Sequence, residues 1–337
     1  MAVSRAAIVG WGDVAIIHHE AIACIEGVDL VGVVDTDAER REAATAALGV
    51  PAFASVAELV DAVAPDVVHI TTPHHQHITP TLEALERGVH VIQEKPLAAS
   101  IEDGQRLVDV MARREAQGLT SPKVGICFQN RYNVSSQELR RLLDSGELGA
   151  VHGAYASVVW TRTADYYKAK PWRGSREESG GGLLINQAIH TLDLVQWFMG
   201  DVVDVAGHVA THRFGDVSEV EDTAEMLLTH ASGLKTAFYA TLTAPQHRPV
   251  ELELDCDNAY VSLRNGLSVT WKDGRGTDRY EERQAPSGGR SYWGVSHELL
   301  VRDFYAKVDD PEPFWISPAE AMKSLQILKA TYQVSGF

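Results

Sequence analysis

The stretch RAAIVGWGDVAIIHHEAIACIEGVDLVGVVD, residues 5–35, decides the fold of this chain. Its first apolar run, 6–9, ends abruptly at Gly10, and Gly10, Gly12 and Ala15 follow the G-x-G-x-x-A spacing. In that pattern the first glycine permits a sharp turn, the second lets the backbone approach a pyrophosphate, and the alanine lets the next helix pack closely. The stretch therefore predicts a strand, a tight turn, a helix and a second strand.

The helix after the turn begins near Val14, so the amides around Asp13 and Val14 lie at a helix N-terminus that suits an anionic phosphate. The second strand, 30–34, ends in Asp35, about 20 residues after the glycine turn. A carboxylate at that position accepts hydrogen bonds from the hydroxyls of an adenosine ribose. Glycine turns often only join two elements, but the strand, the helix and Asp35 in register together predict a dinucleotide site.

Composition and charge exclude several classes of protein. The 337 residues suggest about two domains, and the formal net charge of −16 argues against binding to nucleic acid or to an anionic membrane. No apolar run approaches the ~20 residues of a membrane span, and the chain starts without an apolar signal segment. The three scattered cysteines, Cys24, Cys127 and Cys256, form neither a disulfide framework nor a C-x-x-C metal spacing. We therefore expect reduced thiols and a cytoplasmic protein.

The first 128 residues alternate apolar strands with amphipathic helices, which is typical of a parallel sheet with right-handed crossovers. This pattern predicts an α/β domain over 1–128. From residue 129 on, alternating strand patterns dominate, and Asn265-Gly266 is the strongest hairpin signal. One helix, 183–199, interrupts these strands. We expect a separate α+β domain over 129–337, with a mobile loop at 274–290.

Polar residues follow four of the predicted strands, at the edge of a parallel sheet where ligands bind. Besides Asp35 they are Thr71-Thr72-Pro73-His74, Glu94-Lys95-Pro96 and Gln129-Asn130-Arg131. Lys95 is held between a buried strand and a proline, so its ammonium could hydrogen-bond a substrate hydroxyl or change its pKa through partial burial. The alternative is a loop lysine that pairs with Glu94.

A second cluster lies in GGGLLINQAIHTLDLVQWFMG, residues 180–200. Asn186 and His190 are four positions apart and so share a helix face, and Asp193 follows three residues later. His190 could take a proton, Asn186 could orient a hydroxyl and Asp193 could hold the imidazole. The alternative is a core helix whose polar residues are satisfied internally.

Aromatic and arginine residues precede this cluster, in Tyr166-Tyr167 and Pro171-Trp172-Arg173-Gly174. They could line a polar, sugar-like ligand or close the core of the second domain. Several histidines, including His18-His19 and 74–77, match none of the usual zinc spacings, so we expect no metal.

Together these motifs resemble the Gfo/Idh/MocA family of NAD(P)-dependent oxidoreductases over essentially the whole chain. The resemblance is carried by the glycine turn with Asp35, Thr72-Pro73-His74-His75-Gln76-His77, Glu94-Lys95-Pro96 and the block 180–193. It implies an N-terminal Rossmann domain, which is a doubly wound parallel sheet, and a C-terminal α+β domain. The family's C-terminal sheet is open, mostly antiparallel and often mediates oligomerisation, which implies a homodimer or homotetramer.

The resemblance also implies roles for individual residues. Lys95 would lie beside the nicotinamide and the substrate hydroxyl, often with a cis peptide to Pro96, and His190 would be the acid/base. Asn186, Tyr167 and Arg131 would bind the substrate. The cofactor would be bound by a larger set: Gly10, Gly12, Asp13, Val14, Asp35, Thr72, Pro73, His74, His77, Glu94, Lys95, Trp172 and Arg173.

Two positions depart from the family pattern. Many members have Asn where His74 stands, and many have Asp where Asn186 stands. Asn186 cannot carry a proton, so proton transfer falls on His190 with Lys95 assisting. A subgroup with an Asn-Gln-x-x-His helix is similar, so we expect an altered site rather than an inactive one.

We therefore predict an NAD-dependent dehydrogenase or reductase that transfers a hydride between nicotinamide and a hydroxyl-bearing carbon of a sugar, polyol or related cyclic alcohol. Asp35 and Asp37 would repel the 2′-phosphate of NADP, although Arg40-Arg41 could reach toward it, so NAD is expected and NADP is possible. The rival hypothesis is a non-catalytic dinucleotide or sugar sensor on the same fold. The presence of both Lys95 and His190 argues against that rival.

Overall fold

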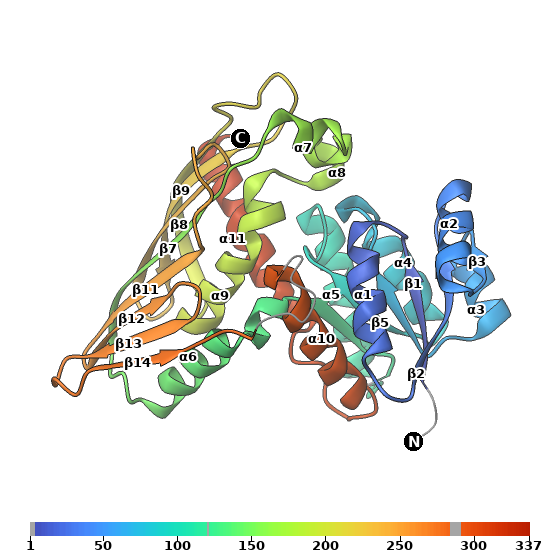
Figure 1. Cartoon of the computed structure of the whole chain (residues 1–337), viewed down its shortest axis with the longest axis horizontal. Coiled ribbons are helices and arrows are strands. Elements are labelled where there is room, and N and C mark those ends of the chain that lie inside the picture. Colours follow the sequence, from blue (N-terminus) through green and yellow to red (C-terminus); the bar gives the residue numbers. More distant parts are fainter. Residues whose placement is uncertain (1–3, 120, 284–290) are drawn as a thin grey trace. The chain divides into compact units, whose positions relative to one another are not determined.

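The computed structural model describes residues 4–119, 121–283 and 291–337 and divides into two compact units (Figure 1). The first unit comprises Met1–Gln129 and Gln284–Met322, and the second comprises Asn130–Arg283 and Lys323–Phe337. The chain thus crosses between the units three times, and a segment near its C-terminus completes the first unit. The predicted boundary after residue 128 does not include this return of the chain to the first unit. The division of the chain into domains 1–128 and 129–337 stays a prediction.

A six-stranded sheet forms the centre of the first unit, in the order β3-β2-β1-β4-β5-β6, with every pair parallel. The strands are β1 (Ser4–Val9), β2 (Val28–Val34), β3 (Ala52–Phe53), β4 (Val67–Ile70), β5 (His90–Glu94) and β6 (Val124–Cys127). All residues of β4 and β6 are buried, as expected where helices cover both faces of a parallel sheet. The strand order reverses between β1 and β4, and ligands bind at such a switch point. The predicted doubly wound sheet is confirmed.

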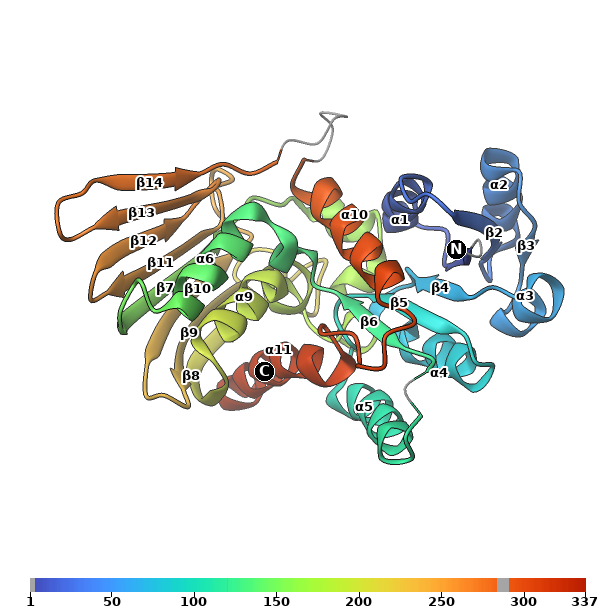
Figure 2. The ribbon, with the colours of Figure 1, turned by 90° about the horizontal axis from the view of Figure 1, so that it is seen from below.

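Helices cover both faces of this sheet. They are α1 (Asp13–Ala23), α2 (Ala38–Leu48), α3 (Val56–Val63), α4 (Ile78–Glu86), α5 (Ile101–Ala116) and α10 (Ser291–Ala306). Helices α1 and α10 pack side by side on one face, and α4 and α5 cover the other (Figure 2). The long-range return of the chain therefore adds a helix next to the one that follows the glycine turn.

An eight-stranded sheet dominates the second unit, in the order β14-β13-β12-β11-β7-β10-β9-β8. Only β7 and β10 pair in parallel, which confirms a mostly antiparallel sheet. The strands are β7 (Val151–Val159), β8 (Val202–Ala210), β9 (Thr223–His230), β10 (Lys235–Thr241), β11 (Glu251–Cys256), β12 (Ala259–Leu263), β13 (Leu267–Trp271) and β14 (Thr277–Tyr280).

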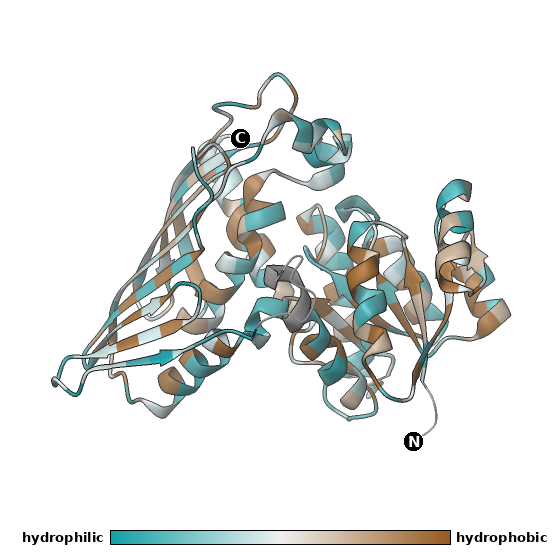
Figure 3. Cartoon of the chain, viewed as in Figure 1, coloured by the Kyte–Doolittle hydropathy of each residue, from teal (hydrophilic) through white to brown (hydrophobic). Residues whose placement is uncertain are grey.

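One face of this sheet is covered and the other is open. Burial alternates along β9 and β10, and hydrophobic and hydrophilic residues alternate along the strands in Figure 3. Helices α6 (Val134–Ser145) and α9 (Ile189–Met199) lie on the covered face, and most of α11 (Pro318–Ser335) also belongs to this unit. In the ranges that the structure describes, no helix of either unit is long and apolar enough to cross a membrane.

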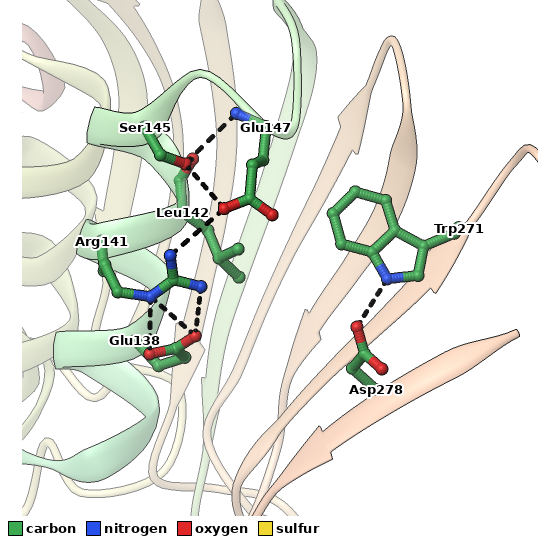
Figure 4. A network of polar contacts seen from close by, with 7 residues as sticks. All are labelled: Glu138, Arg141, Leu142, Ser145, Glu147, Trp271 and Asp278. Atoms are coloured by element: carbon green, nitrogen blue, oxygen red, sulfur yellow. Dashed lines mark hydrogen bonds and ion pairs between the residues drawn. The ribbon is translucent and has the colours of Figure 1, made fainter. Parts of the chain in front are cut away.

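The predicted hairpin joins β12 to β13. Asn265 and Gly266 both have positive φ, +52° and +123°, which the tight primed turns require, so this prediction is confirmed. The predicted mobile loop is wrong in its first part, because residues 277–280 form the edge strand β14. Trp271 Nε1 donates to Asp278 Oδ2 at 2.7 Å and ties β14 to β13 (Figure 4). Residues 284–290 of that loop lie outside the described residues.

Candidate active site

The turn between β1 and α1 leaves open space at a helix start. Gly10 has φ of +94°, and a side chain there would meet the Thr72 methyl group at 2.9 Å. No described atom, in contrast, lies within 4 Å of the position that a Cβ of Gly12 would occupy, and no side chain caps the first turn of α1. An uncapped helix N-terminus beside open space suits a phosphate group. The turn therefore fits the pyrophosphate of a dinucleotide.

Asp35 is buried at the end of β2 and is fixed by the backbone around it. Its Oδ2 accepts the N–H of Trp11 at 2.8 Å, and its Oδ1 accepts the N–H of Asp37 at 2.9 Å. The neighbouring cations are also engaged. Arg41 donates to the carbonyl oxygen of Asp35 at 2.8 Å, and Arg40 lies 3.9 Å from the Asp37 carboxylate. The strand end thus presents a fixed carboxylate, as the dinucleotide pattern requires.

His77 joins the loops that follow β4 and β5. Its imidazole is 1% exposed and lies between two carbonyl oxygens, that of Thr72 at 2.9 Å and that of Pro96 at 2.8 Å, and the neutral ring donates to one of them at a time. Burial lowers the pKa of His77, and the two carbonyl contacts act in the opposite direction. On the other side of the same loop, Thr71 Oγ1 donates to the Gly10 carbonyl at 2.6 Å. The glycine turn, the β4 loop and the β5 loop therefore form one connected frame.

The Lys95–Pro96 peptide is cis, as the family resemblance implies. The preceding Glu94 is 5% exposed; its Oε1 accepts from Nε2 of His18 at 3.1 Å and of His297 at 3.0 Å, and its Oε2 accepts the Lys95 N–H at 3.2 Å. Burial alone would raise the pKa of Glu94, but the hydrogen bonds from the two imidazoles outweigh it and hold that pKa well below its usual range. Glu94 is thus a buried carboxylate held by histidines.

His297 is a residue that sequence reasoning missed, since it lies on α10 and no local motif links it to Glu94. His18 drew attention only as a possible metal ligand. The other predicted residues of this unit lie where the motifs put them: Asp13 and Val14 in the first turn of α1, and Thr72, Pro73 and His74 around the short turn His74–Gln76.

The segment that carries Asn186 and His190 starts with a π-turn, Leu184–Ala188, which continues into α9. The sequence predicts one α-helix over 183–199 instead, because periodicity does not reveal a π-turn. Within 181–190 every residue is buried except Asn186 and His190. These two side chains therefore share the accessible side of an otherwise interior segment. Short π-turns of this kind are frequent at functional sites.

Glu221 fixes the start of this segment. Its buried carboxylate accepts the N–H groups of Gly182, at 2.7 Å, and Leu184, at 2.8 Å, together with the Tyr332 hydroxyl at 2.8 Å. A side chain on Gly182 would collide with the Glu221 backbone, which explains the glycine at this position. Burial raises the pKa of Glu221, and the hydrogen bonds offset that shift only in part. Sequence reasoning missed this residue as well.

Arg131 and Asp193 form a buried ion pair, each 1% exposed. Arg131 donates from Nε to Asp193 Oδ2 at 2.8 Å and from Nη2 to Oδ1 at 2.7 Å, and Ser324 Oγ donates to the same carboxylate at 3.1 Å. These contacts favour an interior structural role for Arg131 over the predicted contact with a substrate. They likewise favour an ion-pair role for Asp193 over holding the His190 imidazole.

The aromatic cluster divides between the core and an arginine stack. The Tyr167 ring is 2% exposed and packs 5.4 Å from Phe214, which favours the alternative that it closes the core. Tyr166 accepts a hydrogen bond from Gln187 at 2.7 Å, and the Arg173 guanidinium lies 4.5 Å above its ring. Trp172 and Arg173 both lie in the short turn Pro171–Gly174.

Two family models match this chain. One, described as an oxidoreductase family with an NAD-binding Rossmann fold, matches residues 4–120, and the Gfo/Idh/MocA C-terminal domain matches residues 136–262. The chain belongs to the Gfo/Idh/MocA family.

Relatives in the Gfo/Idh/MocA family include enzymes of sugar metabolism. A D-apiose dehydrogenase of Paraburkholderia graminis is 27% identical, over 77% of this chain and 67% of the relative. A putative UDP-kanosamine synthase oxidoreductase subunit of Amycolatopsis mediterranei is 28% identical, over 91% of this chain and 89% of the relative. Among solved structures, the WlbA dehydrogenase from Bordetella pertussis in complex with NADH and UDP-GlcNAcA has a TM-score of 0.82 and 27% identity, over 99% of this chain and 96% of that one.

Proposed function

We propose that this Gfo/Idh/MocA protein is an NAD-dependent dehydrogenase or reductase that acts on a hydroxyl-bearing carbon of a sugar, polyol or related cyclic alcohol. The observation that carries the proposal is the hydrogen-bonded Glu94-Lys95-Pro96 loop, which His77 joins to the β4 loop and which Thr71 of that loop joins to the glycine turn. Dehydrogenases of sugars among its relatives support the substrate class.

NAD would be held by the glycine turn, the start of α1 and Asp35. The open space at Gly12 takes the pyrophosphate, and Asp35 has lone pairs left for the ribose hydroxyls after accepting two backbone N–H groups. When bound, NAD supplies the hydride acceptor or donor. The carboxylate repels a 2′-phosphate, and Arg41 already donates to the Asp35 carbonyl, so NAD is preferred over NADP.

The proton of the substrate hydroxyl would be handled by this chain's own side chains. During oxidation His190 takes that proton as general base, and the Lys95 ammonium stabilises the oxygen as negative charge develops on it. Asn186, on the same accessible side of its segment as His190, orients the hydroxyl by hydrogen bonds. Lys95 and His190 belong to different units, so this assignment rests on family membership and on the chemistry of the residues.

The open face of the eight-stranded sheet supports a homodimer or homotetramer. Strand register puts four exposed apolar side chains on the same face, away from α6 and α9: Tyr155, Leu227, Tyr239 and Tyr260. An apolar face of this kind is typical of a protein interface. Light scattering should give a mass of two or four chains, and Tyr239→Lys should lower it; a wild-type monomer would refute the proposal.

We also propose that the protein is located in the cytoplasm. All three cysteines are free thiols in the structure, which suits a reducing compartment.

A turnover assay separates the enzyme from the rival sensor. NADH fluorescence should report binding in both cases, whereas only the enzyme reduces NAD with a panel of sugars, polyols and nucleotide sugars. Lys95→Met should keep NADH binding and lose turnover. Binding without turnover on the whole panel, in either direction, would favour the sensor.

A further inference from the structure

A chain of buried polar side chains leads to Glu94 from within the first unit. Tyr305 Oη lies 3.0 Å from His69 Nε2, His69 Nδ1 lies 2.8 Å from His18 Nδ1, and His18 Nε2 lies 3.1 Å from Glu94 Oε1. His18 and His69 are both 0% exposed. The cofactor contacts proposed above do not use His18, His69 or Tyr305.

The proton positions along this chain follow from Glu94. The low pKa of Glu94 makes it a carboxylate that only accepts, so His18 donates to it from Nε2. Burial lowers the pKa of His18 and of His69, so both rings are neutral and each carries one N–H. His18 Nδ1 must then accept from His69 Nδ1, and His69 Nε2 must accept from the Tyr305 hydroxyl, whose pKa burial raises. Every donor in the chain thus points toward Glu94.

A second donor reaches the same carboxylate oxygen from α10. His297 Nε2 lies 3.0 Å from Glu94 Oε1, and His297 is 1% exposed. The Cys127 thiol on β6 also faces Glu94. Burial is the largest cause that raises the pKa of this thiol, and the Glu94 carboxylate raises it further. The other carboxylate oxygen, Oε2, accepts the backbone N–H of Lys95. The two histidines and the Lys95 N–H therefore meet at one carboxylate.

We propose that His18 and His297 are positioning residues for Lys95, with His69 and Tyr305 fixing the ring of His18. With both imidazoles donating to Oε1, the Glu94 carboxylate cannot rotate, and its Oε2 stays aimed at the Lys95 amide. The lysine backbone is thereby held at the end of β5. The proposal rests on the proposed function, since it treats Lys95 as catalytic.

A metal ion is the competing explanation, because His18 Nε2, Glu94 Oε1 and His297 Nε2 lie within 4.8 Å of one another. The hydrogen-bonded arrangement accounts for the same short distances without a metal. In the donor order above His18 Nε2 carries a proton, which a bound ion would have to displace. The zinc content of the wild type decides between the two explanations.

The test compares His297→Leu, which removes the donor, with His297→Gln, whose amide can donate from a similar position. His230→Leu is the matched control, because His230 is also 1% exposed and hydrogen-bonded, at 2.8 Å to the Gly200 carbonyl, but lies in the second unit. Hydrogen–deuterium exchange across 94–97, read by NMR for each amide separately, reports the Lys95 N–H without any turnover. Steady-state kinetics with NAD and the best substrate of the panel reports catalysis.

We expect His297→Leu to speed exchange in 94–97 by about tenfold or more and to lower kcat by up to about 100-fold, with little change in KM. His297→Gln should bring the exchange rate and kcat most of the way back to their wild-type values, and His230→Leu should change neither quantity. Should His297→Leu fail to fold, His69→Phe, which keeps a ring but removes both nitrogens, should change both readouts in the same direction.

Three results would overturn the proposal. They are unchanged exchange in the His297→Leu or His69→Phe protein, faster exchange with unchanged kcat, and stoichiometric zinc in the wild type that His297→Leu loses. A wild type that turns over no substrate would refute the proposed function alone. The exchange measurement would then still decide whether the histidines hold Lys95.

Discussion

Asp35 has a double task at the end of β2. Its carboxylate holds the backbone of Trp11 in the glycine turn and of Asp37 at the next helix cap, and we propose that its negative charge also selects NAD over NADP. The sequence predicts the second task from the position of the residue. The first task depends on contacts that only the folded chain creates.

Asp35→Ser should narrow the preference for NAD over NADP by at least tenfold, or about 1.4 kcal/mol. The serine removes the charge that repels the 2′-phosphate and is small enough to leave room for it. The ratio of kcat/KM for the two cofactors measures the effect. A wild type with comparable efficiency on both would contradict the assignment of Asp35.

Gly12→Val should abolish NADH binding while the fold survives. A Cβ added at this position has no described atom within 4 Å apart from those of the neighbouring residues, so the isopropyl group enters the space proposed for the pyrophosphate. Fluorescence titration and circular dichroism together check this. Gly10→Val is the contrasting control, because the positive φ and the nearby Thr72 should make it destabilising. Near-wild-type NADH affinity in Gly12→Val would make the turn merely structural.

Lys95→Met and His190→Asn should each lower turnover by about 10²-fold or more with little change in NADH affinity. The first removes a charge and three donors, and the second removes the imidazole that we propose as general base. Wild-type oxidation should rise with pH as the imidazole of His190 loses its proton, and His190→Asn should flatten that limb. If His190→Asn keeps full activity and the same rise of oxidation with pH, proton transfer would have to be reassigned to Lys95 or to water.

At the scale of elements, the π-turn before α9 depends on a carboxylate from a distant loop. Glu221 satisfies two N–H groups at the start of the segment, Gly182 and Leu184, which no local side chain caps. The segment thus keeps Asn186 and His190 accessible while the residues around them are buried.

Glu221→Gln should destabilise the protein by about 1–3 kcal/mol, because the amide nitrogen cannot accept from a backbone N–H and leaves a buried donor unsatisfied. Urea unfolding measures the loss. Glu177→Gln, at an exposed position on the helix Arg176–Ser179, is the control and should stay within about 0.5 kcal/mol. A Glu221→Gln protein as stable as the control would show that the hydrogen bonds of Glu221 contribute nothing to the free energy of unfolding.

At the scale of the whole molecule, buried histidines make stability depend on pH. The pKa values of His18, His69 and His77 are all lowered in the folded protein, with burial as the largest cause. The unfolded chain binds protons at these rings below their ordinary pKa of 6.5, whereas the folded chain does not. Their contribution is therefore present above about pH 6.5 and is lost as the pH falls toward the lowered values.

The free energy of unfolding should accordingly fall between pH 7 and pH 5, by up to about 1.4 kcal/mol per pH unit for each such histidine. Urea unfolding at pH 7.5, 6.5 and 5.5 checks this. His69→Phe removes one of the three groups and should make the decline less steep. Stability that stays flat or rises on acidification would contradict the neutral state of these rings.

The sequence by itself determined the elements that obey local rules. The glycine turn and the Asn265-Gly266 hairpin each depend on neighbours in the chain, and hydrophobic periodicity separates the parallel from the antiparallel sheet. Lys95 was singled out by its place between a strand and a proline, and Asn186 and His190 by their spacing on one helix face; the family resemblance then implied their roles.

Only the tertiary structure decided which polar groups meet across the chain. Glu94 and His297 are 203 positions apart, Arg131 and Asp193 62, and Glu221 and Gly182 39. No spacing rule predicts such pairs, because each arises when two elements pack and a buried polar atom must find a partner. Helix α10 is an example: its return to the first unit brings the His297 imidazole to Glu94.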